Sequence, residues 1–240
     1  MNLSLRMEAV VSLVSPQSFT IADVGCDHAY VSIALIERGL ASKVIAMDVR
    51  EGPLSIAQTN ITNAGLHNVI DVRLGDGLEK LAPNETDTII IAGMGGLLMT
   101  GILERGSHIL EKGQPTLILQ PQSELSNVRQ YIMKHGYEII EEKMLMEEGK
   151  YYTVMKALPS HEERTYVYKE EDYEYGYYNL LHKNPVLYQY LEKERKVLSE
   201  IYDNLMKQKE DLSPKTRIRI KELQHELARN ERALLRYKEV

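Results

Sequence analysis

The sequence predicts an α/β protein: a doubly wound, mostly parallel seven-stranded sheet of the Rossmann-like type, followed by an antiparallel coiled-coil hairpin of two helices. In the first 157 residues, short β-branched apolar runs alternate with amphipathic stretches. Strands separated by helices need crossover connections, which make neighbouring strands parallel. Toward the C-terminus the apolar period changes to seven residues, which indicates a coiled coil. We therefore expect two domains, at residues 1–159 and 160–240.

Seven runs have the composition and the flanking turn residues of strands. They lie at residues 20–24, 43–48, 69–74, 88–92, 116–120, 137–146 and 151–158. Helices are expected in the intervals, at 29–38, 53–64, after Gly96 and at 123–135. Only residues 147–150 separate the last two strands, so these two strands should form an antiparallel hairpin.

The C-terminal repeat predicts two helices of about 25 residues that fold back on each other at Ser213-Pro214. The seven-residue spacing is carried by Leu191, Leu198, Leu205 and Leu212 and, after the break, by Ile220, Leu227 and Leu234. Glu194 and Asn230 fall at positions of the apolar seam and make it imperfect. Residues 160–184, rich in tyrosine and charge, are expected to be a connector.

Composition indicates a soluble protein of the cytoplasm. Hydrophobic residues make up 43% of the 240 positions, which is ample for a core. The single cysteine, Cys26, excludes an intramolecular disulfide, and the N-terminus lacks the pattern of a secretory signal. The most apolar run, residues 88–103, contains four glycines and is too short to cross a bilayer. We therefore expect no membrane span.

The charge is unevenly distributed along the chain. A net charge of −6 argues against a nucleic-acid partner, but residues 214–240 hold eight basic and four acidic residues. The basic candidates for contact with a polyanion are Arg217, Arg219 and Lys221 near the turn and Arg229, Arg232 and Arg236 along the second helix. The last three fall on faces that the leucine seam leaves free. The alternative is a solvated coiled-coil surface.

The loop after the first strand, Asp23 to Tyr30, has the sequence D-V-G-C-D-H-A-Y. A dinucleotide site would need G-x-G-x-x-G, so that a pyrophosphate can approach backbone amides. Here a single glycine, Gly25, stands between Asp23 and Asp27, and two carboxylates repel a pyrophosphate but attract a cation. S-adenosylmethionine carries an ammonium and a sulfonium beside its nucleoside, and it suits this loop.

Three other predicted strands end in acidic or glycine-rich segments. Asp48, followed by Val49, is placed to accept hydrogen bonds from ribose hydroxyls, and Gly75-Asp76-Gly77 is placed to meet an adenine amine. The fourth segment is Ala92-Gly93-Met94-Gly95. Since ligands of parallel sheets bind at the carboxyl ends of the strands, all four segments should converge there.

Each of these residues also has a structural interpretation. Asp27 suits a helix cap, Asp48 a solvated strand end, His28 the surface and Met94 the core, while the glycines suit turns. The combination at four successive strand ends favours a methyltransferase over a dehydrogenase.

Four segments together resemble the TrmK family of bacterial tRNA adenine-N1 methyltransferases, and the resemblance runs over nearly the whole chain. They are L-S-L-R-M at 3–7, D-V-G-C-D-H-A-Y at 23–30, I-A-G-M-G-G at 91–96 and Q-P-Q at 120–122. The resemblance implies a class I methyltransferase fold and methyl transfer from S-adenosylmethionine to N1 of adenosine 22 in tRNA. In one departure, Gln122 stands where the family usually has asparagine.

The candidate site residues follow from these patterns. Cofactor-binding candidates are Asp23, Gly25, Asp27, His28, Asp48, Val49, Gly75, Asp76, Gly77, Ala92, Gly93, Met94 and Gly95. Asp27 and Gln120 are the catalytic candidates, because a carboxylate stabilises the cationic product and an amide can hydrogen-bond the base edge. Substrate-binding candidates are Arg6, Tyr30, Pro121 and the basic residues of the hairpin. Arg6 suits a phosphate contact or a surface ion pair equally well.

The expected partner is tRNA. We expect the protein to be a monomer and to bind no metal ion. Two alternatives remain open from the residues: a class I methyltransferase that acts on another RNA, a small molecule or a protein, and a noncatalytic RNA-binding module.

Overall fold

The computed structural model describes residues 2–16, 18–160, 166–207 and 213–238. The chain forms two compact units, unit 1 (Met1–Arg164) and unit 2 (Thr165–Val240), and each is described by itself.

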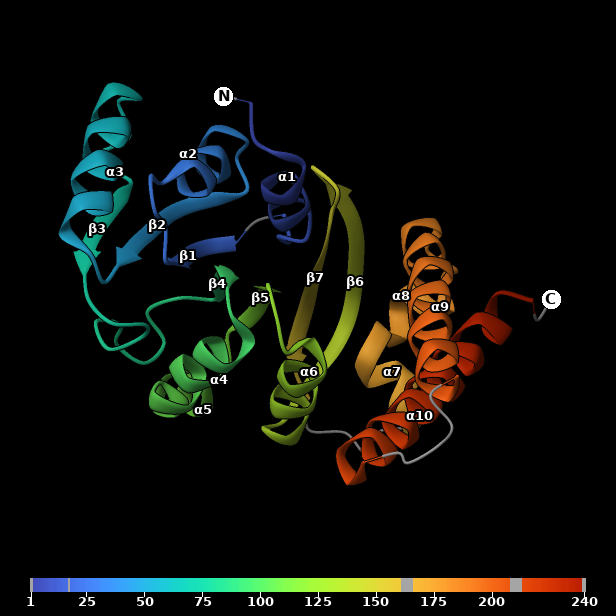
Figure 1. The fold of residues 1–240 in the computed structure, drawn as a ribbon. Helices are drawn as coiled ribbons and strands as arrows, with labels where there is room; N and C mark the ends of the chain where they lie inside the picture. Colours follow the sequence, from blue (N-terminus) through green and yellow to red (C-terminus); the bar gives the residue numbers. More distant parts are fainter. Residues whose placement is uncertain (1, 17, 161–165, 208–212, 239–240) are drawn as a thin grey trace. The chain divides into compact units, whose positions relative to one another are not determined.

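Unit 1 contains one seven-stranded sheet with strand order β3-β2-β1-β4-β5-β7-β6 (Figure 1). Its strands are β1 (Ser18–Val24), β2 (Ala41–Asp48), β3 (Ile70–Leu74), β4 (Thr88–Met94), β5 (Thr116–Pro121), β6 (Tyr137–Glu147) and β7 (Lys150–Pro159). The first five are mutually parallel, and β7 runs antiparallel to both β5 and β6. All seven predicted strands are present, and the predicted terminal hairpin is confirmed. Its turn uses Glu148 and Gly149, both with positive φ, which matches the twist of the two strands.

Helices cover both faces of this sheet. In Figure 1, α1 (Leu5–Ser12), α2 (Tyr30–Glu37) and α3 (Glu51–Asn63) lie over one face, while α4 (Gly96–Arg105), α5 (Ser107–Gly113) and α6 (Leu125–Lys134) lie over the other. The doubly wound prediction is therefore confirmed. The sequence interpretation missed α5. Its predecessor α4 ends at Arg105, and α5 begins at Ser107, directly after Gly106, where an added Cβ would lie 2.4 Å from Leu78 Cδ1.

The central strands form the core of unit 1. Strands β1, β2, β4 and β5 are buried along most of their length, as parallel strands covered on both faces must be. Strand order reverses between β1 and β4, because the chain leaves β1 for β2 and β3 on one side and returns to β4 on the other. This reversal is the position at which parallel sheets bind ligands.

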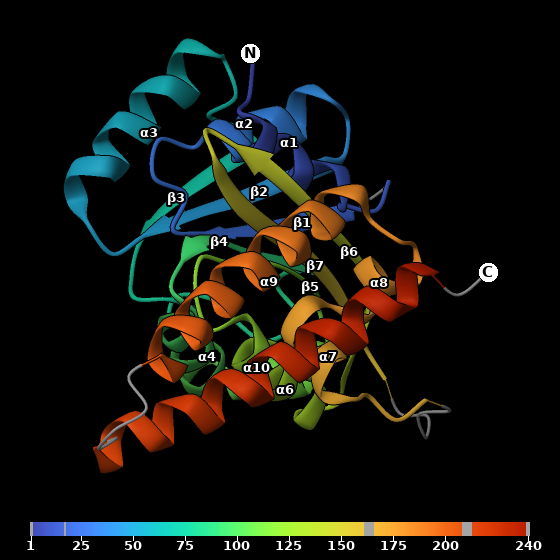
Figure 2. The ribbon, with the colours of Figure 1, turned by 45° about the vertical axis from the view of Figure 1, so that its right-hand side comes forward.

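Unit 2 is built on the predicted antiparallel hairpin of α9 (Pro185–Met206) and α10 (Pro214–Lys238), which lie side by side in Figure 2. Two contacts fix the antiparallel direction: the rings of Tyr188 and Tyr237 lie 5.2 Å apart, and Gln224 Nε2 donates to Tyr202 Oη at 3.2 Å. The buried seam residues are Leu187, Leu191, Leu198, Ile220, Leu223 and Leu234. Leu212 lies outside the described residues.

The predicted connector is wrong for the described residues 166–184, which form α7 (Glu170–Tyr175) and α8 (Tyr177–Leu181). Both helices pack on α10. Tyr175 and Leu180 are buried, so the segment contributes to the core of unit 2. Its acidic residues misled the prediction because their partners are arginines 59 to 64 positions away along the chain, which local composition does not reveal.

In the part of the chain that the structure describes, no helix is both long and apolar enough to traverse a membrane.

Candidate functional site

A cavity of about 480 Å³ lies at the carboxyl ends of β1 to β5 in unit 1. Four parallel strand spacings cover about 19 Å, so the cavity is long enough for a nucleoside at one end and a second group at the other. Most of the residues predicted from the strand ends line it: Asp23, Gly25, Asp27, His28, Asp48, Val49, Gly75, Asp76, Gly77, Ala92, Gly93 and Met94, with Tyr30, Arg6 and Gln120. Its volume falls within the range of small-molecule sites.

The β1 loop closes tightly over β2. The backbone N–H groups of Gly25 and Cys26 both donate to Met47 O, at 2.8 and 2.9 Å. Gly25 has a φ of +74°, and a Cβ added there would lie 2.3 Å from Met94 Cε. Only glycine permits both this backbone conformation and the approach of Met94. The position therefore brings the β1 and β4 loops together.

Asp23, at the end of β1, is 4% exposed. Burial raises the pKa of its carboxyl to about 6, against the opposing effect of the hydrogen bond that Ser32 Oγ donates at 2.6 Å. Asp48 raises it further by charge repulsion. A cation bound beside Asp23 would relieve both the burial cost and this repulsion.

Asp27 is not a helix cap. Helix α2 begins at Tyr30 behind Ala29, with no side-chain capping hydrogen bond. The Asp27 side chain is 58% exposed, and its Oδ1 lies 3.7 Å from His28 Nε2. His28 in turn meets the edge of the Tyr30 ring, with centroids 5.7 Å apart. The three side chains thus form one polar wall of the cavity.

Asp48 is not a solvated strand end. It is 5% exposed, and its Oδ1 accepts from the backbone N–H of Arg50 at 2.9 Å. This contact leaves the other carboxylate oxygen, Oδ2, without a hydrogen bond among the described residues. Such an oxygen at the cavity wall suits a ligand hydroxyl.

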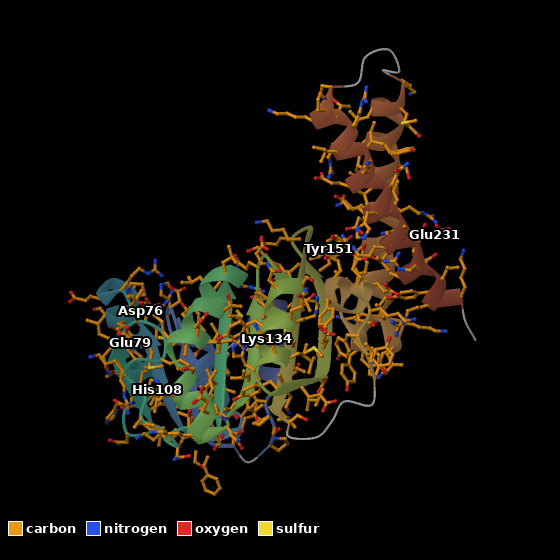
Figure 3. All side chains as sticks on the ribbon, turned by 90° about the horizontal axis from the view of Figure 1, so that it is seen from below. Asp76, Glu79, His108, Lys134, Tyr151 and Glu231 are labelled. Atoms are coloured by element: carbon orange, nitrogen blue, oxygen red, sulfur yellow. The ribbon has the colours of Figure 1, made fainter. Side chains whose placement is uncertain are left out.

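Asp76 lies in the loop after β3, at the surface of unit 1 with Glu79 (Figure 3). Both of its carboxylate oxygens accept from Arg105 Nη2 at 3.1 Å. The carboxylate of Asp76 is therefore at the cavity, as predicted. It also accepts hydrogen bonds from Arg105 of α4, which the sequence interpretation did not predict.

Gln120 joins the ends of β4 and β5. It is fully buried, and its Oε1 accepts from Gly93 N at 3.0 Å and from Arg6 Nη1 at 3.2 Å. Its Nε2 donates to Pro121 O at 3.2 Å. Because these contacts occupy the amide, Gln120 positions the β4 loop and Arg6. That Gln120 also hydrogen-bonds the edge of the base stays a prediction.

Two predicted residues do not line the cavity. Gly95 precedes α4 and approaches Ser123, and Pro121 is buried at the end of β5. Conversely, the sequence interpretation missed Met7, Val10, Cys26, Arg50, Leu98, Ile102 and Gln122, all of which line it. The apolar residues of α1 and α4 in this set are spaced three or four positions apart. This spacing predicts that each helix has an apolar face, but it does not show that the face lines a ligand cavity.

The basic residues of the hairpin are not all free. In unit 2, Arg229 and Arg232 pair with Glu170, at 3.2 and 2.8 Å, and Arg232 also pairs with Glu171 at 3.0 Å. Arg236 pairs with the buried Asp172. The expectation that the seam leaves these arginines free is therefore wrong, because their charges hold α7 on α10. Arg219 pairs along its own helix with Glu222 and Glu226.

The donor set of the cavity fits S-adenosylmethionine. Carboxylates at the ends of β1, β2 and β3 suit an ammonium, a sulfonium and ribose hydroxyls, and the glycines at Gly25 and Gly93 permit close backbone approach. Within residues 2–16, 18–160, 166–207 and 213–238, no three His, Cys, Asp or Glu side chains are grouped so that they could hold a metal ion.

Comparison with known proteins agrees with this geometry. The family model TrmK, described as tRNA (adenine(22)-N(1))-methyltransferase, matches residues 21–232. The chain belongs to the TrmK family. The resemblance found in its sequence motifs is thereby confirmed.

Individual TrmK relatives support the assignment. The tRNA (adenine(22)-N(1))-methyltransferase of Bacillus subtilis is 40% identical over 157 residues, which span 65% of this chain and 65% of that protein. The crystal structure of the B. subtilis m1A22 tRNA methyltransferase TrmK has a TM-score of 0.87 at 30% identity, covering 97% of this chain and 99% of that one. Streptococcus pneumoniae Sp1610, a putative tRNA (m1A22) methyltransferase, was solved in complex with S-adenosyl-L-methionine. It has a TM-score of 0.83 at 31% identity and covers 97% of this chain and 100% of that one. The chain is thus a TrmK-type methyltransferase whose family uses S-adenosylmethionine.

Proposed function

We propose that this chain transfers the methyl group of S-adenosylmethionine to N1 of adenosine 22 in tRNA. The observation that carries the proposal is the cavity at the ends of β1 to β5, with acidic strand ends at one side and close glycine backbones in the middle, in a chain of the TrmK family. The target nucleotide is taken from related proteins, which are named as methyltransferases of adenosine 22 in tRNA.

Unit 1 holds the cofactor in this proposal. Asp48 binds the ribose hydroxyls, and the loop after β3 with Asp76 faces the adenine. Asp23 and the backbone at Gly25 meet the amino-acid portion. S-adenosylmethionine, when bound, supplies an electrophilic methyl group on a sulfonium.

The acceptor needs positioning rather than a general base. N1 of adenine carries a free lone pair at neutral pH, so it attacks the methyl carbon without losing a proton. The N1–C bond forms as the S–C bond breaks, and sulfur keeps the electron pair. Holding the base in line with the methyl group lowers the barrier, and desolvation of N1 adds to the effect. The base must leave its stack to reach the cavity.

Asp27 is the group that meets the developing charge. The methylated base is cationic, and a carboxylate at the cavity wall stabilises that charge more in the transition state than in the ground state. Replacing Asp27 with asparagine keeps the shape and removes the charge. We expect kcat to fall while the Kd of S-adenosylmethionine is retained; an unchanged kcat would remove Asp27 from the reaction.

The tRNA contact of unit 2 rests on fewer residues than the sequence predicted. Lys221 is exposed near the start of α10, whereas Arg229, Arg232 and Arg236 form ion pairs with α7. We assign phosphate contacts to the start of α10. The proposal places the enzyme in the cytoplasm as a monomer, because tRNA is found there and the cavity is formed within one chain.

One experiment tests the function and its alternatives. The chain is incubated with methyl-labelled S-adenosylmethionine and a tRNA transcript that carries adenosine at position 22, beside a transcript with guanosine there, followed by nucleoside analysis. We expect 1-methyladenosine in the first transcript alone. Label in both transcripts would indicate a different target. No label in either, with cofactor binding retained, would indicate a different substrate. Absence of cofactor binding would leave an RNA-binding module.

A further inference from the structure

Arg6 is a cation of the cavity that has no carboxylate partner among the described residues. It is the second residue of α1, and it lines the cavity as a half-buried side chain. Its side-chain hydrogen bond goes to a neutral amide. The other arginine of the cavity, Arg50, differs because its Nε lies 3.5 Å from Asp48 Oδ1. A half-buried charge without a counter-ion favours an anionic ligand.

Two neutral contacts hold the Arg6 guanidinium in place. Its Nη1 donates to Gln120 Oε1 at 3.2 Å, and its Cζ lies 5.5 Å from the centroid of the Tyr152 ring. The same Nη1 would be 3.1 Å from a Cβ added to Gly93, so the group lies directly against the β4 loop. These partners orient the guanidinium without neutralising it. The guanidinium of Arg6 has further N–H groups that can donate to a ligand.

We infer that Arg6 is the anion-binding group of the cavity and that it binds an oxyanion of a ligand. Two sources have this chemistry: the α-carboxylate of S-adenosylmethionine and a phosphate of the RNA strand that carries the target base. An arginine can bind either of these oxyanions through two parallel N–H···O hydrogen bonds. The inference rests on the proposed function and adds a specific group to it. The carboxylate of Asp23 would then meet the ammonium of the same amino-acid portion.

The first arm of the test addresses the cofactor. Wild-type chain and Arg6→Met are titrated calorimetrically with S-adenosylmethionine and with decarboxylated S-adenosylmethionine. If Arg6 binds the carboxylate, the wild type prefers the complete cofactor by about tenfold to 100-fold, and Arg6→Met loses this preference.

The second arm addresses the RNA. The phosphates flanking the target adenosine are replaced one at a time by neutral methylphosphonates, and kcat/KM is measured with both proteins. If Arg6 binds one of these phosphates, its replacement lowers kcat/KM for the wild type and has no further effect in Arg6→Met, while the affinity for S-adenosylmethionine is unchanged.

Two further variants separate ligand binding from support of α1. Arg38 pairs with Glu8 of α1 at 2.7 Å away from the cavity, so Arg38→Met loosens the same helix without changing the charge of the cavity. It should keep the wild-type discrimination in both arms, and Arg6→Lys should restore part of what Arg6→Met loses. If Arg6→Met discriminates as the wild type does in both arms, the inference is overturned and Arg6 only positions α1. A wild-type chain that does not bind S-adenosylmethionine would overturn the proposed function, and the inference with it.

Discussion

In unit 1 Asp27 and Asp48 line a cavity, whereas in unit 2 Asp172, Glu170 and Glu171 each meet an arginine of α10. The two regions are built from the same residue types. In the first, carboxylates follow strands whose ends lie side by side, so their charges gather around a space. In the second, acidic residues of a short helix face a basic helix, so their charges are neutralised inside the unit.

The two regions show how a ligand site can be distinguished from an ion-pair network. A charge-rich sequence does not by itself show whether its charged residues form a ligand site or an ion-pair network. What matters is whether tertiary packing supplies a counter-charge, as it does for Arg236, or supplies none among the described residues, as for Asp23 at the cavity. Five predictions test this comparison, from the largest expected effect to the smallest.

Removal of a neutralised buried charge should cost the most. Asp172 is fully buried and accepts from Arg236, from Tyr166 Oη at 2.8 Å and from the Lys169 N–H at 2.8 Å. Asp172→Ala leaves Arg236 without its carboxylate, so we expect the free energy of unfolding to fall by about 3 to 5 kcal/mol. Chemical denaturation of the full chain measures the loss, and hydrogen exchange in α7 and α10 localises it. Unchanged exchange in these helices would show that the pair does not hold α7.

Removal of a carboxylate that lines the cavity should weaken ligand binding and leave the free energy of unfolding nearly unchanged. Asp48→Ala should weaken S-adenosylmethionine binding by about 1.5 to 3 kcal/mol for each hydrogen bond lost to the charged acceptor. Calorimetry measures the Kd. Asp71, paired with Arg73 at 2.9 Å and outside the cavity, supplies the matched control Asp71→Ala, which should bind as the wild type does. Equal affinities for both variants would remove Asp48 from the site.

The pH dependence of binding should report on Asp23. Its pKa is raised to about 6 by burial, and a cationic ligand favours the ionised form. Affinity should therefore be fully present above the raised pKa and decline by up to about tenfold per unit as pH falls below 6. Asp23→Asn should flatten this profile, whereas His28→Gln should retain it. A profile that survives in Asp23→Asn would assign the proton to another group.

For the unliganded chain, the sign of the pH effect at Asp23 is opposite. A carboxyl with a raised folded-state pKa stabilises the fold at low pH, and this contribution is lost as pH rises from the unfolded pKa toward 6. At neutral pH, Asp23→Asn should therefore raise the melting temperature of the protein while it weakens cofactor binding. A lower melting temperature would contradict this explanation.

The smallest effect is expected at an exposed ion pair. Arg219 contacts Glu222 and Glu226 on its own helix, and its side chain is 42% exposed. Arg219→Ala should leave the free energy of unfolding almost unchanged, because solvent screens the pair. Denaturation under the conditions used for Asp172→Ala gives the comparison. A loss as large as that of Asp172→Ala would show that burial does not separate the two networks.

The seven strands, the two long C-terminal helices and their order could be predicted from the sequence. The alternation of β-branched runs with amphipathic stretches located all seven strands, and the seven-residue repeat located α9 and α10, because both signals are periodic within a few residues. The ends of the strands also placed Asp23, Asp48 and Gly25 correctly, because parallel strands bring their carboxyl ends to one edge of the sheet.

Tertiary structure alone decided which of these groups are free. Whether Gln120 offers its amide to a ligand depends on Gly93 and Arg6, and whether Arg232 is available depends on α7. These partners lie between 27 and 114 positions away along the chain. The sequence records each charge, but hydrogen bonds and ion pairs form between atoms that meet in space, so their pairing exists only in the folded chain.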